Sequence, residues 1–280
     1  MQSLKSEFTR ALKGSGMIIA PIIIFLLLLQ EGLSTGLIEA FKNESGNTNV
    51  ELFGMTVFFA SVVLLIPFLS AIPYSAIFCE EYESGNIYLT LHRKSLFRYV
   101  SDKVITVWFT GFFVTFIPIL LYGIICSVFA VPFDTSVEEY NQMLENTAWE
   151  VVLTNGGLIY IFLQSFFLGC FGASCALFAL LVSVFFPNKY FTWCFPLIFC
   201  FVLNFILPRL NLSVFNPMQS FDPSYSLLNF SGKITGIIYM LLYHIVVFII
   251  GFITFYAGIV RRVFYGTIKL CCFAVQKMEK

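Results

Sequence analysis

Charged residues are scarce in this sequence, and their scarcity excludes an ordinary soluble domain. Only 11% of the 280 residues are charged, 59% are hydrophobic, and the mean hydropathy is +0.87. A typical soluble domain is about 25% charged and about 45–50% apolar. Because long apolar stretches are stable only when they are removed from water, the composition predicts an all-α integral membrane protein.

Residues that carry chemistry are equally scarce. The chain has two histidines without the H-E-x-x-H spacing, and it lacks the G-x-x-x-x-G-K-[ST] motif of nucleotide-binding loops. An integral membrane enzyme would need a catalytic constellation at one membrane face, and no paired intramembrane carboxylates supply one. We therefore expect no catalytic, cofactor-binding or metal-binding residues, and any ATP-driven step would require an ATPase on another chain.

Six stretches are long and apolar enough to cross a bilayer, which takes roughly 20 residues. The second, fourth and sixth stretches exceed the minimum length, so tilt or kinks are expected there, and Pro67 and Pro73 fall within the second. Residues 208–233 are too apolar for a solvated loop and too broken for a span, so short re-entrant or interfacial helices are expected there. The loops are too short for a separate core, so residues 1–280 form a single transmembrane domain. The six predicted spans cover residues 16–33, 54–78, 104–131, 156–186, 190–207 and 234–260.

The distribution of lysine and arginine predicts the orientation. With the N-terminus on the cytoplasmic side, only Lys42, Arg209 and Lys233 of the 16 Lys and Arg lie outside, as the positive-inside rule requires. Six crossings then return the C-terminus, with a tail over residues 261–280, to the cytoplasm.

The first fourteen residues have the pattern of an amphipathic helix. Leu4, Phe8, Ala11 and Leu12 share one face, basic residues lie opposite, and the Gly-Ser-Gly at 14–16 ends the helix. The segment is either an interfacial helix on the inner leaflet or a basic flank that orients the first span, and both can hold.

Residues 79–103 form the most distinctive segment. An acidic cluster at Glu80, Glu81 and Glu83 is followed by Ser84-Gly85, a short apolar stretch and a basic cluster. Anionic lipid would repel acidic groups placed directly after a span. Either a partner protein covers the cluster, or the segment is an ordinary solvated loop.

This segment resembles the cytoplasmic loop of type-2 ATP-binding cassette (ABC) transporter permeases. In that family an acidic segment leads into Gly-Thr-Ile/Leu, a Leu-rich turn, a proline, a Ser-Arg pair and a lysine that opens the third span. The chain departs from the pattern at Asn86 (the family threonine), at Lys94 (near the family proline) and over 95–98, where the Ser-Arg pair is spread out. The residues that fit are Glu81, Glu83, Gly85, Ile87, Leu89, Leu91 and Lys103.

The resemblance implies a short coupling helix between spans two and three that docks on a separate ATPase subunit, which binds ATP and Mg. A second permease copy or a sibling permease completes the transporter. The implied cargo is a hydrophobic or amphipathic compound, such as an antimicrobial peptide or drug, exported across a bacterial plasma membrane; lipids are the other partners, and no nucleic acid is expected. The implied ATPase contacts are Glu80, Glu81, Glu83, Ser84, Gly85, Asn86, Ile87, Leu89, His92 and Arg93.

Polar residues within spans are the candidates for a substrate path, because each is costly in hydrocarbon. Gln30, Glu31, Gln164 and Asn204 are of this kind, although interhelical hydrogen bonds or, for Glu31, headgroup depth also explain them. His244 is expected to have a structural role. The alternative function is a secondary transporter or channel without an ATPase. That class usually shows inverted repeats or charged groups at mid-membrane, and neither is evident here.

Small residues in the fourth predicted span suggest close helix packing. Gly169 with Ala173, and Gly172 with Ala176, are small-xxx-small pairs that allow two helix backbones to approach.

Overall fold

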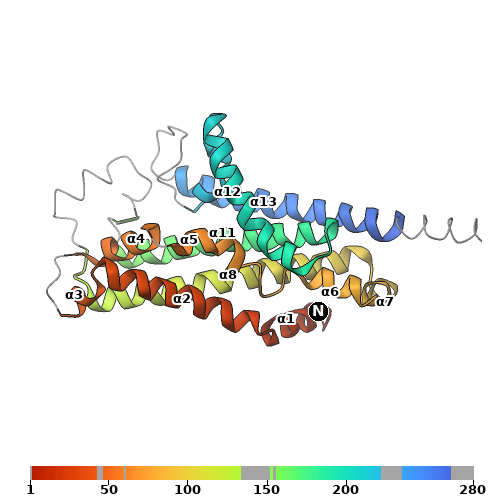
Figure 1. Cartoon of the computed structure of the whole chain (residues 1–280), viewed down its shortest axis with the longest axis horizontal. Helices are drawn as coiled ribbons and strands as arrows, with labels where there is room; N and C mark the ends of the chain where they lie inside the picture. The colour runs from red at the N-terminus through yellow and green to blue at the C-terminus, as the bar shows by residue number, and fades with distance from the viewer. Residues whose placement is uncertain are drawn as a thin grey trace, which may run out of the picture.

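The computed structural model describes residues 2–42, 47–59, 61–133, 152–153, 156–221 and 235–265. Within these ranges the regular elements are helices, and the only extended pairing is an isolated parallel bridge between Thr48 and Val131. The helices form an elongated bundle with short helices at its two ends (Figure 1). The predicted all-helical architecture is therefore confirmed.

Within the described residues, five helices are long and apolar enough to cross a membrane, and a bent helix pair makes a sixth if it is counted as one span. The chain is thus a multi-pass membrane protein. The five helices are α2 (Gly16–Thr35), α8 (Leu96–Phe129), α11 (Gly157–Phe185), α12 (Lys189–Arg209) and α13 (Thr235–Ile259).

The predicted second span at 54–78 differs most from the structure. It is divided between α4 (Asn49–Phe59) and α5 (Ser61–Leu69), which are bent by 62° relative to one another. Residues 70–76 then form turns, with Pro73 among them, and Ile77 begins a further helix, α6 (Ile77–Glu83). A tilt or kink was expected in this span, and the structure instead divides it into helices that bend and turn. A proline has no N–H to donate to a helix, so Pro73 suits the turn in which it lies.

The third span begins at Leu96, eight residues before the predicted start at 104. Ser95 precedes it with extended backbone angles (φ −61°, ψ 147°). The first two turns of α8 contain Arg98, Asp102 and Lys103. The apolar stretch therefore begins later in the sequence than the helix does. These turns carry the polar site described below.

Two small-residue contacts bring α8 and α11 together at the centre of the bundle. A Cβ atom added to Gly111 of α8 would lie 2.6 Å from Cβ of Ala176 and 3.1 Å from Cα of Ala173, both on α11. One added to Gly172 would lie 2.5 Å from Thr115 of α8. Helix α11 is the central helix, since most of its residues are buried. The small residues of the fourth span therefore allow the close approach expected of them.

A larger residue at Gly111 is expected to separate these helices. Gly111→Val should lower the stability by about 1–3 kcal/mol, the usual cost of overpacking a close contact. The measurement is thermal unfolding in detergent. Gly54→Val is the control, because the nearest atom to an added Cβ there is the Tyr160 hydroxyl, at an unstrained 3.7 Å. Equal unfolding temperatures for the two variants would contradict the packing argument.

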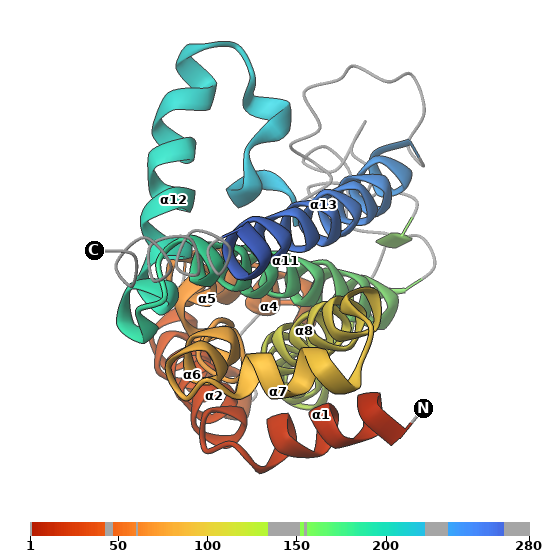
Figure 2. The ribbon, with the colours of Figure 1, turned by 90° about the vertical axis from the view of Figure 1, so that its right-hand side faces the viewer.

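Helices α1 (Gln2–Lys13), α6 and α7 (Asn86–Arg93) lie together at one end of the bundle, and α3 (Leu37–Phe41) lies at the other (Figure 1). Viewed along the bundle, α1 and α7 run across its end, and α12 leaves the bundle (Figure 2). Beyond α12, two short 3-10 helices, η1 (Ser213–Phe215) and η2 (Pro217–Gln219), occupy part of the segment for which short helices were expected. A π-helical turn, η4 (Val260–Tyr265), follows α13. Residues 222–234 and the tail beyond 265 lie outside the described residues.

Candidate functional site

A buried lysine organises the end of the bundle where α1, α6 and α7 meet. Lys103, in the second turn of α8, is 1% exposed. Its Nζ donates to Oε2 of Glu7 on α1 at 2.7 Å and to Oε1 of Glu81 on α6 at 2.5 Å. Glu7, Glu81 and Lys103, here called the ion cluster, thus join the three helices α1, α6 and α8.

Two tyrosines complete the surroundings of the ion cluster. The Tyr99 hydroxyl donates to Oε2 of Glu81 at 2.8 Å, and the Tyr74 hydroxyl donates to Oε2 of Glu7. Both rings lie with their centroids 5.6 Å from Nζ of Lys103, within cation–π range. The buried charges therefore have both opposite charges and hydrogen-bond partners, which buried charges require.

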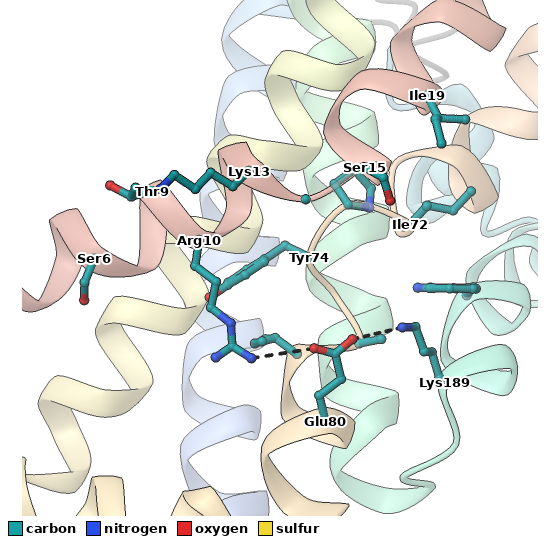
Figure 3. Close-up of a pocket in the computed structure, with 16 residues that line it drawn as sticks. Ser6, Thr9, Arg10, Lys13, Ser15, Ile19, Ile72, Tyr74, Glu80 and Lys189 are labelled. Atoms are coloured by element: carbon teal, nitrogen blue, oxygen red, sulfur yellow. Dashed lines mark hydrogen bonds and ion pairs between the residues drawn. The ribbon is translucent and has the colours of Figure 1, made fainter. Parts of the chain in front are cut away.

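More exposed ion pairs surround the ion cluster. Arg10 contacts Glu81 at 2.9 Å and Glu80 at 3.6 Å, and Lys189 at the start of α12 contacts Glu80 at 2.9 Å (Figure 3). Lys94 lies 3.7 Å from Asp102 and 4.0 Å from Glu7. Glu80 and its two partners are about half exposed, and exposed pairs of this kind contribute little stability. Among the charged contacts of α1, the buried ion cluster is therefore the one expected to matter most.

Sequence reasoning missed Glu7. It assigned the hydrophobic face of residues 1–14 to the membrane and overlooked the one carboxylate on the segment. Glu7 lies four residues before Ala11, which is fully buried, so both residues point to the same side of α1. That spacing was the available signal that Glu7 is buried. The partner of Glu7, Lys103, is 96 residues away, and no local pattern indicates this pairing.

The predicted ATPase-contact residues divide into two groups. Glu81 is 5% exposed and belongs to the ion cluster, and Ile87 is fully buried beneath α7, so neither side chain reaches the surface. Gly85 precedes α7 with φ +72°, a left-handed conformation that favours glycine. That these residues contact an ATPase remains a prediction, and its surface is limited to the exposed members: Glu80, Glu83, Ser84, Asn86, Leu89, His92 and Arg93.

Helix α7 has an anchored face and an apolar exposed face. Ile87 packs in the same buried cluster as Tyr99 and Val100 of α8. On the outside, Leu89 is 61% exposed and Tyr88 is 39% exposed. Helix α7 therefore exposes a leucine and a tyrosine while Ile87 holds it against the bundle.

The four residues predicted for a substrate path lie on three helices. Gln30 and Glu31 are on the last turns of α2, with Gln30 exposed. Gln164 is fully buried within α11, and its two amide atoms have no hydrogen-bond partner among the described residues. Asn204 is exposed on α12 and accepts a 2.8 Å hydrogen bond from Asn216. No hydrogen bond or ion pair between described side chains links any two of the four.

His244 has the structural surroundings expected of it. Its Nδ1 lies 3.0 Å from the Ser174 hydroxyl, and its Nε2 lies 3.3 Å from the Ser220 carbonyl oxygen. Among the residues that the structure describes, no group of His, Cys, Asp and Glu side chains is arranged to hold a metal ion.

The ion cluster is expected to make stability depend on acidic pH. Burial alone would raise the pKa of Glu7, but the charge of Lys103 and the hydrogen bonds from Lys103 and Tyr74 outweigh it and place the pKa below the ordinary value of 4.5. A lowered folded-state pKa means that this stabilisation is present above about pH 4.5 and is lost as the pH falls through the folded-state value. The unfolding temperature in detergent should therefore fall more steeply with acidification in the wild type than in Glu7→Gln. Glu39→Gln, at the other end of the bundle, should keep the wild-type slope, and an unchanged slope in Glu7→Gln would contradict this account.

The described residues define a class: a multi-pass helical membrane protein with an amphipathic helix fixed across one end by buried charges. Comparison of the chain with models of protein families, with curated proteins and with solved structures found no match. A more specific function therefore depends on the chain's own geometry and on the resemblance of its 79–103 segment.

Proposed function

We propose that this chain is the permease subunit of an ATP-binding cassette exporter and that it works with separate ATPase subunits. The observation that carries the proposal is α7, a short helix across one end of a membrane bundle with Leu89 and Tyr88 exposed. It lies in the segment whose sequence resembles the ATPase-docking loop of such permeases. In this proposal ATP and Mg bind to the partner, and the chain itself catalyses nothing.

The proposed orientation places this end in the cytoplasm together with both termini. Helices α1, α6 and α7 lie at the same end of the bundle, and the C-terminal end of α13 points the same way (Figure 1). This arrangement gathers most of the basic residues on one side, which supports the assignment by the positive-inside rule.

The ion cluster supplies a physical route for coupling. A push on α7 reaches α6, which is separated from it only by Ser84 and Gly85. Glu81 of α6 is bonded to Lys103 of α8, and Lys103 is bonded to Glu7 of α1. ATPase movement would therefore displace α1, α6 and α8 together rather than bend a loop.

The proposed cargo is a hydrophobic or amphipathic compound, such as an antimicrobial peptide or drug. It would pass between this chain and a second permease copy or a sibling, with Gln30, Glu31, Gln164 and Asn204 as candidate path residues. The exposed apolar faces of α2 and α12 are available for lipid, cargo or a second permease.

The test is purification of the tagged chain from its native membranes in mild detergent. The proposal predicts that a chain with nucleotide-binding motifs copurifies and that the complex hydrolyses ATP in a vanadate-sensitive manner. A chain that purifies without an ATPase, yet moves solute in vesicles under an ion gradient, would favour the alternative of a secondary transporter or channel.

A further inference from the structure

A hollow of about 660 Å³ lies beside the ion cluster, between α1, the start of α2, the 70–76 turns, α6 and the start of α12 (Figure 3). This volume is within the range of about 300–1,000 Å³ that is typical of small-molecule sites. The hollow is distinct from the exposed face of α7, and the proposed function gives it no role.

The polar side of the hollow is cationic. Arg10, Lys13 and Lys189 line it, against a single carboxylate, Glu80. Arg10 pairs with Glu81 of the ion cluster and with Glu80, and Lys189 also pairs with Glu80, whereas Lys13 is exposed and has no ion pair among the described side chains. The lining therefore carries excess positive charge and suits an anionic group.

The other side of the hollow is apolar and continuous with the membrane-facing surface of α2. Ile72 and Ile19 line it, and Ile19 is 51% exposed in the first turn of α2. Cationic and apolar walls that meet at the end of a span match a molecule with a charged head and a hydrocarbon tail. A free inorganic anion would use only one of the two walls.

Trp193 adds an independent observation. It lines the hollow, its ring lies under Lys189 at 5.3 Å, and its buried Nε1–H has no acceptor among the described residues. A buried donor without an acceptor is unusual in a folded protein. The indole ring thus borders the hollow beside a lysine, and tryptophan is commonly found at the interfaces of membrane proteins, where phospholipid headgroups lie.

We propose that the hollow between α1, α2, α6 and α12 binds one anionic phospholipid. Lys13, Arg10 and Lys189 hold its phosphate group, the ring of Trp193 borders the headgroup region, and Ile19 and Ile72 contact the top of an acyl chain. The bound lipid would fill the gap between α1 and α12. The proposal does not depend on the transport function.

The experiment uses Trp193 as its own reporter. The other two tryptophans of the chain, Trp108 and Trp149, are replaced by phenylalanine. The full chain is then reconstituted in phosphatidylcholine vesicles that contain a small fraction of a lipid brominated near the top of one acyl chain. Brominated phosphatidylglycerol is expected to quench Trp193 more strongly than brominated phosphatidylcholine at the same fraction. Equal quenching by the two lipids would overturn the proposal.

Charge variants separate a built site from general attraction. Lys13→Gln and Lys189→Gln should each lower the relative affinity for the anionic lipid about fivefold, the effect of one basic residue near an anionic headgroup. Glu80→Gln should raise it. Lys5→Gln is the control, because it removes the same charge from an exposed position on α1 that does not line the hollow. An equal loss in Lys5→Gln would show general attraction only and overturn the site.

Two further arms complete the test. Inorganic phosphate at matched ionic strength should not remove the preference, and its removal would assign the site to a soluble anion instead. If the single-tryptophan chain does not fold, native mass spectrometry of the wild type and Lys13→Gln counts bound phosphatidylglycerol, and equal counts would reject the proposal.

Discussion

Replacing Lys103 with methionine is expected to lower stability by about 3–5 kcal/mol and to free α1 from the end of the bundle. The substitution removes the positive charge that lies between Glu7 and Glu81, both of which remain buried. Loss of one partner of a buried pair typically costs this much, because the remaining charge stays out of water without compensation. Here two carboxylates would remain and would repel each other.

Thermal unfolding in detergent and protease cleavage near Gly14 measure this effect. Lys94→Met is the matched control, since Lys94 also lies near two carboxylates, but its side chain is 23% exposed and its contacts are 3.7 and 4.0 Å. We expect that control to cost less than about 1 kcal/mol. Adding Glu7→Gln and Glu81→Gln to Lys103→Met should recover much of the loss, because no net charge then remains buried in the ion cluster. Equal unfolding temperatures and equal cleavage rates for Lys103→Met and Lys94→Met would show that the ion cluster does not hold α1.

Leu89→Asp is expected to abolish copurification of an ATPase while leaving the fold unchanged. Leu89 is 61% exposed on α7, so an aspartate there enters water without disturbing the core. If a partner covers this surface, the substitution places a charge against an apolar contact, where truncation of a central residue alone often costs about 2 kcal/mol or more.

Arg98→Gln provides the control for that variant. Arg98 is exposed at the start of α8 at the same end of the molecule, and its replacement changes the net charge by the same amount. The ATPase recovered with each variant is compared with that recovered with the wild type at equal membrane expression. Full recovery of the ATPase with Leu89→Asp would show that α7 is not part of the ATPase interface. Glu81 is unsuitable for this test, because its reversal would disrupt the ion cluster as well.

Hydropathy predicted the bundle well because spanning helices are determined by local composition. The apolar runs at 16–33, 156–186 and 190–207 lie within a few residues of α2, α11 and α12. The span at 54–78 was the exception. A tilt or kink was expected there, but its residues are mostly apolar, and mean hydropathy carries no information about where an apolar segment bends or turns.

The polar site was less predictable because charged residues in a short segment were assumed to face solvent or a partner. Glu81 faces inward instead, and its partners Lys103 and Arg10 lie 22 and 71 residues away. Lys103 was assigned only as the start of a span, yet it follows Tyr99 by four residues, so both reach Glu81 from one face of α8. Tertiary pairing of this kind requires the folded arrangement of α1, α6 and α8.

A photo-crosslinking amino acid in place of Leu89, activated in native membranes, tests the proposed function most directly. The account predicts that it captures a chain with nucleotide-binding motifs. The same probe at Ile38, which is 47% exposed on α3 at the opposite end, should capture no such chain. Capture of the ATPase at Ile38, or its absence at Leu89 in membranes that contain it, would contradict the assignment of α7 as the docking surface.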